Sequence, residues 1–203
     1  MRQTKKLLQE LNCRCIRGEL PREVKQVAYD SRNVEPGGLF VCIRGSRQDG
    51  HAFIREAVER GAVVILTEKG AWKEDNSSQE AAKQQKYCVL ETPDTRAALA
   101  SIARQWFDNP QEKLKIVGVT GTKGKTSTAW MIWKMFTADG KKCGLIGTIE
   151  VCYGTWQQTI RNTTPESYEL YEILRKMVDQ GCQYVVMEVS SQALKMHRVD
   201  GIM

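Results

Sequence analysis

Apolar residues fall in short runs separated by polar turns through the first half of the chain. Mostly apolar runs predict strands at 24–29, 39–43, 62–67 and 87–90. Apolar residues at helical spacing predict helices at 52–60 and 94–107. The second of these helices places four apolar side chains on one face: Leu99, Ile102, Ala103 and Trp106. Strands that alternate with helices predict an α/β layered fold.

The alternation restarts after Asp108-Asn109-Pro110-Gln111, where Asn-Pro breaks a helix and favours a turn. We therefore predict two domains, 1–111 and 112–203. The pattern of the second domain predicts, in order, strand 115–119, helix 125–138, strand 144–148, a hairpin to 160, a helix to about 180 and strand 184–189. Pro165 suits the first turn of the last helix, and we predict Thr164 as its N-cap.

Three strands joined by helices predict the beginning of a parallel sheet. A nucleotide-binding sheet of three strands is thin and has an open edge, so we expect this chain to be the front part of a longer protein. Residues 69–86 are rich in Lys, Glu, Gln, Ser and Ala, which predicts a solvated loop or a frayed helix.

Composition narrows the class of protein. The 203 residues are 41% hydrophobic, and no segment has the roughly 18 uninterrupted apolar residues of a membrane helix. Seven scattered cysteines favour reduced thiols in a cytoplasmic protein over a disulfide framework. The net charge of +6 comes from basic residues interleaved with acidic ones, which suits polyanionic small molecules and predicts no nucleic-acid partner. We expect a monomer.

The most specific chemical signal lies at 118–127, Gly-Val-Thr-Gly-Thr-Lys-Gly-Lys-Thr-Ser, between a predicted strand and a predicted helix. Glycines let a loop approach an anion closely, and backbone N–H groups at a helix N-terminus supply positive potential. We predict that ATP binds here, on Gly121, Thr122, Lys123, Gly124, Lys125, Thr126 and Ser127. Lys125 would reach the β/γ-phosphates, and the Thr126 hydroxyl would hold Mg²⁺. The strict phosphate-loop pattern needs glycine where Val119 stands, so a glycine-rich turn with a surface lysine remains the alternative.

Glu188 ends an apolar strand, where a carboxylate is costly unless it is paired or bound to a metal. Open α/β sheets place their ligands at the carboxyl ends of the strands. We predict that Glu188 and Thr126 share the Mg²⁺, and the alternative is an exposed glutamate at the strand end.

Further motifs follow one another along the chain in a family-specific order. They are Asp30-Ser31-Arg32, 36–41, 120–126, Asn162-Thr163-Thr164-Pro165, 188–194 and His197-Arg198-Val199. Together they resemble the Mur ligases, the ATP-dependent amide-forming enzymes of peptidoglycan precursor synthesis, and especially the type that adds the third amino acid. The resemblance implies a small N-terminal UDP-binding domain followed by an incomplete ATPase domain. The implied reaction transfers the ATP γ-phosphoryl group to a substrate carboxylate, and an amine then attacks the acyl phosphate.

The resemblance also implies roles for individual residues. Lys125 would be catalytic, and the substrate would be a UDP-N-acetylmuramoyl dipeptide. Its UDP part would contact Ser31 and the turn Ser46-Arg47-Gln48. Its muramoyl-peptide part would contact five residues: Asn162, Thr163, Thr164, Ser190 and Arg198. Lys123 stands where the family often has asparagine, and Gln192 where it often has histidine. The family's other parts supply the amino-acid pocket, so we expect these residues alone not to ligate.

Plainer interpretations of these residues remain open. Thr163 and Thr164 could simply mark the start of a helix, and Ser190 could simply cap one. Ser31 could be a turn residue, and Arg198 could be a solvated surface residue. We interpret His51 and His197 as structural or surface residues. Three other classes of protein also remain: a different Mur-like ligase such as a folylpolyglutamate synthase, a small phosphate-loop NTPase, and a non-catalytic binding module.

Overall fold

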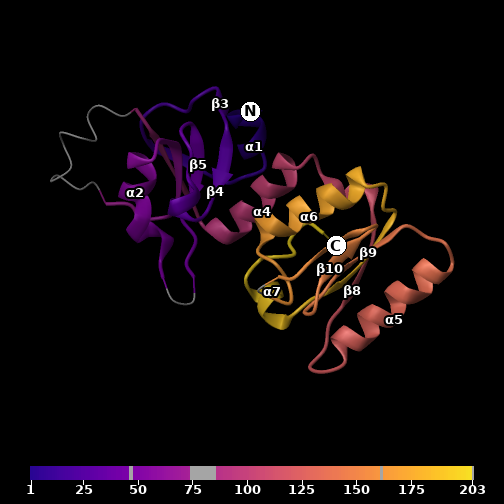
Figure 1. The fold of residues 1–203 in the computed structure, drawn as a ribbon. Helices are drawn as coiled ribbons and strands as arrows, with labels where there is room; N and C mark the ends of the chain where they lie inside the picture. Colours follow the sequence, from indigo (N-terminus) through magenta and orange to yellow (C-terminus); the bar gives the residue numbers. More distant parts are fainter. Residues whose placement is uncertain (46–47, 74–85, 161, 203) are drawn as a thin grey trace. The chain divides into compact units, whose positions relative to one another are not determined.

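The computed structural model describes residues 1–45, 48–73, 86–160 and 162–202, which form two compact units (Figure 1). Unit 1 is Met1–Ile102 and unit 2 is Ala103–Met203, so the division falls inside helix α4 (Thr95–Trp106). The predicted boundary after residue 111 lies beyond this division, and the domain limits stay a prediction.

Unit 1 is built on a five-stranded sheet with the order β2-β7-β6-β5-β4. Strands β4 to β7 run parallel and β2 runs antiparallel to β7. The bounds of these strands are β2 Arg14–Arg17, β4 Gln26–Ala28, β5 Gly38–Val41, β6 Ala62–Glu68 and β7 Cys88–Thr92. A separate pair joins β1 (Arg2–Gln3) to β3 (Glu23–Val24). The parallel strands were predicted from their apolar runs, whereas β1 and β2 carry too few apolar residues to signal a strand.

Short helices complete unit 1. They are α1 (Thr4–Leu8), η1 (Ser31–Asn33), η2 (Gly50–Phe53) and α2 (Ile54–Glu59). Helix α2 buries Ala57 and Val58 against Phe40, Ile65 and Val89 of the sheet. All four residues of β5 are buried because a central parallel strand is covered on both faces.

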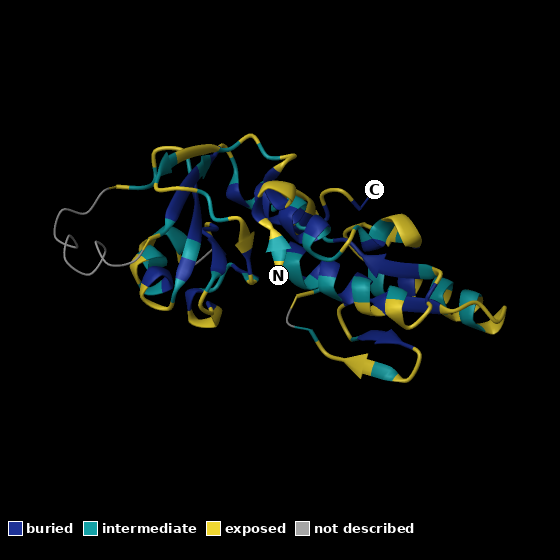
Figure 2. Cartoon of the chain, turned by 90° about the horizontal axis from the view of Figure 1, so that it is seen from above, coloured by how far each residue is buried: buried dark blue, intermediate teal, exposed yellow. Residues whose placement is uncertain are grey.

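Unit 2 also contains a five-stranded sheet, with the order β11-β10-β9-β12-β8. Strands β8 (Lys115–Val119), β12 (Tyr184–Glu188) and β9 (Cys143–Ile146) run parallel. The hairpin β10 (Val151–Tyr153) and β11 (Trp156–Gln158) then extends the sheet in antiparallel pairing. The predicted parallel sheet and the hairpin are confirmed. The sheet has five strands and not the expected three, because the two strands of the hairpin extend it. Figure 2 shows a buried β10 beside a more exposed β11.

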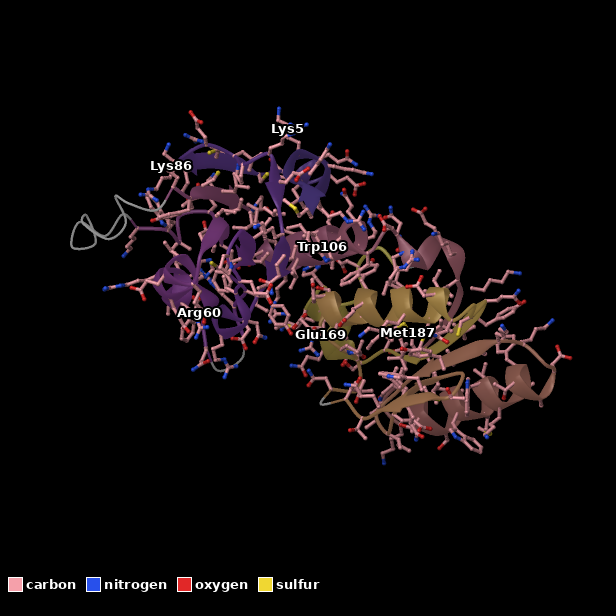
Figure 3. The ribbon with its side chains drawn as sticks, turned by 45° about the horizontal axis from the view of Figure 1, so that its top comes forward. Lys5, Arg60, Lys86, Trp106, Glu169 and Met187 are labelled. Carbon is pink, nitrogen blue, oxygen red and sulfur yellow. The ribbon has the colours of Figure 1, made fainter. Side chains whose placement is uncertain are left out.

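Two helices cover opposite faces of the unit 2 sheet (Figure 1). Residues of α6 (Ser167–Asp179) pack on Ile146 and Met187, whereas residues of α5 (Lys125–Ala138) pack on Leu145 and Val186. Successive strand residues point to opposite faces, so each strand contributes to both cores. Figure 3 labels Met187, which lies on β12 among the side chains of the α6 core.

The ends of the helices test the predicted capping. Helix α5 has the predicted bounds, and a short helix α7 (Ser191–Lys195) follows β12. The predicted N-cap of α6 is wrong: Glu166 occupies that position, and Thr164 and Pro165 precede it. Thr164 is instead fully buried, and its hydroxyl group is satisfied there by hydrogen bonds to the backbone of the 188–190 segment. Most of the polar stretch 69–86 lies outside the described residues.

Candidate nucleotide and cation site

The loop at 120–124 leads from β8 directly into α5, as a phosphate-binding loop requires. Gly124 is the N-cap of α5 with φ of +79°, and Gly121 has φ of +151°. Residues with a Cβ rarely adopt such positive values. A Cβ at Gly124 would meet no atom within 4 Å, so the backbone conformation, and not space, requires glycine there.

Lys125 keeps its ammonium group at the loop. Its Nζ donates a hydrogen bond of 2.8 Å to the carbonyl oxygen of Gly121. Thr122, Lys123 and Ser127 are exposed around it, whereas Thr126 is half-buried and faces inward. The loop therefore presents a cation and several hydroxyl groups beside the first turn of a 14-residue helix.

Glu188, at the end of β12, is 1% exposed. The hydroxyl group of Thr126 donates to its Oε2 over 2.9 Å. The alternative of an exposed strand-end glutamate is therefore wrong. The structure brings together the two residues that the sequence predicted as cation ligands.

The sequence reasoning missed Thr148, which follows β9 at the same edge of the sheet. Its backbone N–H donates to Glu188 Oε1 over 2.8 Å, and its hydroxyl group lies 3.2 Å from Oε2. Gly147 makes this approach possible, because a Cβ there would lie 2.5 Å from Oε1. The pair Gly-Thr at the end of a strand that neighbours β12 was the available signal.

The segment 162–164 contacts Thr148 and the backbone of Glu188. The hydroxyl group of Thr163 lies 3.0 Å from that of Thr148. Thr164 donates its hydroxyl proton to the carbonyl oxygen of Glu188 over 2.9 Å and accepts from the Ser190 backbone N–H over 3.1 Å. Asn162 is exposed beside them. The alternative that the two threonines only start a helix is therefore wrong, because α6 begins after Glu166.

Arg198 and Ser190 lie next to this segment. Arg198 Nη1 donates to the Thr164 carbonyl oxygen over 3.2 Å, and Nε lies 3.4 Å from Glu166 Oε2. The Arg198 side chain is only 12% exposed, so the alternative of a solvated arginine is wrong. Ser190 does cap α7, because its Oγ accepts from the Ala193 N–H over 3.1 Å.

The predicted UDP contacts lie in unit 1. Ser31 is 5% exposed in η1, and its hydroxyl group donates to Glu56 Oε2 over 2.8 Å. The neighbouring Arg32 guanidinium bonds to Asp30 and lowers the pKa of that carboxyl group. Gln48 is exposed, while Ser46 and Arg47 lie outside the described residues.

The two histidines are held by aspartates. His51 Nδ1 lies 2.5 Å from Asp49 Oδ1, and its Nε2 accepts from the Glu68 backbone N–H, so this side chain, which is 8% exposed, has a structural role. His197 Nδ1 lies 2.7 Å from Asp200 Oδ2 and its side chain is 39% exposed. Both positions agree with the interpretation of the histidines as structural or surface residues.

The donor atoms at Glu188 suit a hard cation. Carboxylate and hydroxyl oxygens are the ligands that Mg²⁺ prefers, and nucleotide sites usually supply only one or two of them beside phosphate and water. Among the described residues, no group of three or more His, Cys, Asp or Glu residues could hold a metal ion. Thr126 and Glu188 therefore fit a cation that arrives with phosphates better than a metal held by the protein alone. No described helix is long and apolar enough to cross a bilayer.

The seven thiols have ordinary structural surroundings and none is in a disulfide. Burial raises the pKa of Cys88 and of Cys143 to about 12 and that of Cys152 to about 11. Such thiols stay protonated at neutral pH and are poor nucleophiles.

Two family models match the two halves of the chain. The model of the Mur ligase family catalytic domain matches residues 23–107, and that of the Mur ligase middle domain matches residues 119–203. The chain belongs to the Mur ligase family. The family resemblance noted in the sequence is thereby confirmed, and with it the α/β fold class.

Two curated relatives match the chain over nearly its whole length. The chain is 40% identical over 198 residues to the UDP-N-acetylmuramoyl-L-alanyl-D-glutamate--2,6-diaminopimelate ligase of Clostridium perfringens. It is 39% identical over 193 residues to that of Syntrophomonas wolfei. These matches cover 98% and 95% of the chain but only 39% and 37% of the relatives. The chain therefore spans well under half the length of the curated relatives it matches.

Solved structures show the same fold. A structure of a UDP-N-acetylmuramoyl-L-alanyl-D-glutamate--2,6-diaminopimelate ligase matches with a TM-score of 0.68 at 21% identity, over 89% of this chain and 34% of that one. The D-alanyl-D-alanyl-adding ligase of Acinetobacter baumannii matches with a TM-score of 0.59 at 22% identity, over 93% of this chain and 36% of that one. At these identities the likeness supports the arrangement of elements.

Proposed function

We propose that this chain supplies the substrate-binding and ATP-binding front part of an amide ligase that extends UDP-N-acetylmuramoyl-L-Ala-D-Glu by a third amino acid. The names of the relatives point to 2,6-diaminopimelate as that amino acid. Residues 1–111 would bind the UDP-sugar and residues 112–203 would begin the ATP-binding domain. The enzyme would act in the cytoplasm, where its nucleotide substrates are found.

The observation that carries this proposal is the contact of Thr126 with Glu188 behind the phosphate loop. A hydroxyl group at the start of a helix and a buried carboxylate at the end of the adjacent parallel strand meet at 2.9 Å. Mg²⁺ would supply the positive charge that draws the phosphate oxygens to this point. Thr126 and Glu188 would hold it, while Gly121, Thr122, Lys123, Gly124 and Ser127 would surround the phosphates.

Lys125 has the catalytic role in this proposal. Its ammonium group would leave the Gly121 carbonyl oxygen and approach the transferred phosphoryl group, where negative charge develops. The acceptor of that group would be a substrate carboxylate, and the acyl phosphate would then react with an amine.

The muramoyl-peptide part would lie along Asn162, Thr163, Thr164, Ser190 and Arg198. These residues come from three chain segments that meet at Thr164, whose hydroxyl group bonds to the Glu188 carbonyl oxygen, so the phosphoryl donor and acceptor would be neighbours. A guanidinium group suits a carboxylate or phosphate by two parallel hydrogen bonds. The UDP part would bind in unit 1, near Ser31 and the 46–48 turn.

Calorimetric titration of this chain with a non-hydrolysable ATP analogue and Mg²⁺ tests the nucleotide site. Loss of one such charge contact costs about 3 kcal/mol, so Lys125→Ala should weaken binding about a hundredfold. Lys141→Ala, beyond the other end of α5, is the matched control and should bind like the wild type. Binding that is equal in both variants would contradict the site.

A second titration with the UDP-N-acetylmuramoyl dipeptide separates the other classes of protein. Binding of the sugar nucleotide by a chain that does not bind ATP would indicate a non-catalytic binding module. ATP hydrolysis by the chain with no affinity for the sugar nucleotide would indicate a small NTPase.

A further inference from the structure

Four side chains form a hydrogen-bonded row at the carboxyl ends of the unit 2 strands. The row runs from Thr163 to Thr148, from Thr148 to Glu188, and from Glu188 to Thr126, over 3.0, 3.2 and 2.9 Å. It therefore joins the phosphate loop to the 162–164 segment through a residue, Thr148, that neither predicted site includes.

The number of available protons sets the direction of the row. An ionised carboxylate only accepts hydrogen bonds, and a hydroxyl group has one proton to donate. The Thr148 hydroxyl group has one proton and lies within donating distance of two acceptors, Thr163 Oγ1 over 3.0 Å and Glu188 Oε2 over 3.2 Å. A charged carboxylate is the stronger acceptor, so we assign the proton to Glu188, and the Thr163 hydroxyl group then donates to Thr148. Thr148 also donates its backbone N–H to Oε1 over 2.8 Å, and thereby holds both oxygens of Glu188.

This double contact matters when a cation arrives. The Thr126 hydroxyl group can donate its proton to Glu188 and still offer a lone pair of its oxygen to Mg²⁺. Its single bond holds only Oε2, whereas the two bonds from Thr148 hold both oxygens of the carboxylate and would keep it oriented toward a cation. Hydrogen bonds to a charged group are stronger than hydrogen bonds between neutral groups, so the two bonds from Thr148 stabilise the carboxylate more than neutral bonds would.

We infer that Thr148 is a positioning residue for Glu188, which aims the carboxylate at the cation of the nucleotide and links it to Thr163 on the acceptor side. This inference rests on the proposed function. The hydroxyl group is not needed for the local turn, because the Gly147 N–H already donates to the Glu150 carbonyl oxygen over 2.9 Å. Thr148 is itself exposed, so its side chain can be changed without opening the core.

The test measures how much Mg²⁺ strengthens binding of a non-hydrolysable ATP analogue to this chain, by calorimetry with and without the cation. Thr148→Val removes the hydroxyl group at constant shape and should reduce the Mg²⁺-dependent gain about tenfold, the usual effect of one charge-assisted hydrogen bond. Binding without Mg²⁺ should stay within about twofold, because Thr148 contacts no residue of the loop backbone in this row. Thr148→Ser keeps the proton and should restore the gain.

Matched variants make each outcome decisive. Thr155→Val, an exposed threonine in the turn of the β10–β11 hairpin, should behave like the wild type. Thr163→Val should have a smaller effect than Thr148→Val, because Thr148 still donates to Glu188. The inference is overturned if Thr148→Val keeps the full gain, or if it weakens binding equally with and without Mg²⁺, as a merely structural role would. A wild-type chain that binds no nucleotide would instead overturn the proposed function.

Discussion

Ser31 in unit 1 and Glu188 in unit 2 are buried polar residues at predicted substrate or cation sites, 5% and 1% exposed. Ser31 has its hydroxyl proton engaged by Glu56, on the helix that follows the next strand of the same unit. Glu188 instead receives hydrogen bonds from Thr126 and Thr148, which lie on two other segments. A carboxylate keeps lone pairs in reserve when it accepts hydrogen bonds. The site in unit 2 is therefore assembled around an acceptor that can still bind a cation, whereas the hydroxyl proton of Ser31 is already committed.

The largest effect on this difference between the two sites is expected from Glu188→Gln, which keeps the shape of the side chain and removes its negative charge. The new amide group has only one oxygen to accept from Thr148 and Thr126. We expect the Mg²⁺-dependent gain in binding of an ATP analogue to fall about a hundredfold, because a neutral amide is a far weaker ligand for Mg²⁺. Calorimetry measures it. Glu56→Gln in unit 1 is the control, and an equal loss there would mean that the two sites do not differ.

The next effect concerns folding of unit 2. Thr164→Val leaves the Glu188 carbonyl oxygen and the Ser190 N–H without their partner in a fully buried position. Buried groups that lose a partner cost about 2 kcal/mol in the free energy of unfolding. Urea denaturation followed by circular dichroism measures this loss. An exposed change such as Thr155→Val should stay within about 0.5 kcal/mol, and an equal result for both would contradict the anchoring role of Thr164.

A smaller effect is expected in unit 1. Ser31→Ala removes one donor from Glu56, whose carboxylate is partly exposed and also lies 3.2 Å from Arg60 Nε. Water and Arg60 can satisfy the carboxylate, so we expect a loss of about 1 kcal/mol in the free energy of unfolding. Binding of the ATP analogue should not change. A change in nucleotide affinity would show that the two units are energetically coupled.

A separate effect is a gradual loss of stability at alkaline pH. In the unfolded chain the thiols ionise near their ordinary pKa of 9.0, whereas in the folded protein burial holds the pKa of Cys143 near 12 and that of Cys152 near 11. The unfolded state therefore binds fewer protons above pH 9, and the free energy of unfolding falls as pH rises from about 9 towards 11.

Urea midpoints at pH 8 and pH 10 measure this slope. The double variant Cys143→Ala and Cys152→Ala lacks two of the three buried thiols of unit 2, so its slope should be shallower than that of the wild type. Thr155→Val, at an exposed residue of unit 2 without a titratable group, provides the control and should leave the slope unchanged. An unchanged slope in the double variant would contradict the assignment to these thiols.

The fold could be predicted well wherever a hydrophobic run coincided with a local signal. Strand 115–119 and helix 125–138 have the predicted bounds, because an apolar strand, glycines with free φ and an apolar helix face stand next to one another. Strands β1 and β2 could not be predicted, since two to four residues of mixed polarity become strands only by pairing. The predicted N-cap of α6 was wrong because the Thr164 hydroxyl group bonds to the Glu188 carbonyl oxygen at the end of β12, and Glu166 occupies the N-cap position instead.

The sequence by itself determined the resemblance to Mur ligases, the α/β layers, the phosphate loop and the candidacy of Glu188 and Thr126, because each motif or element is a short run of neighbouring residues that can be recognised without knowing its contacts. Only the tertiary structure decided what surrounds Glu188. Thr126, Thr148 and Thr164 come from distant segments, and parallel pairing of β8, β9 and β12 brings their carboxyl ends to one edge. Nothing local marks a threonine as the partner of a carboxylate 40 residues away. The physical reason is that strand register, and not chain proximity, sets which side chains meet.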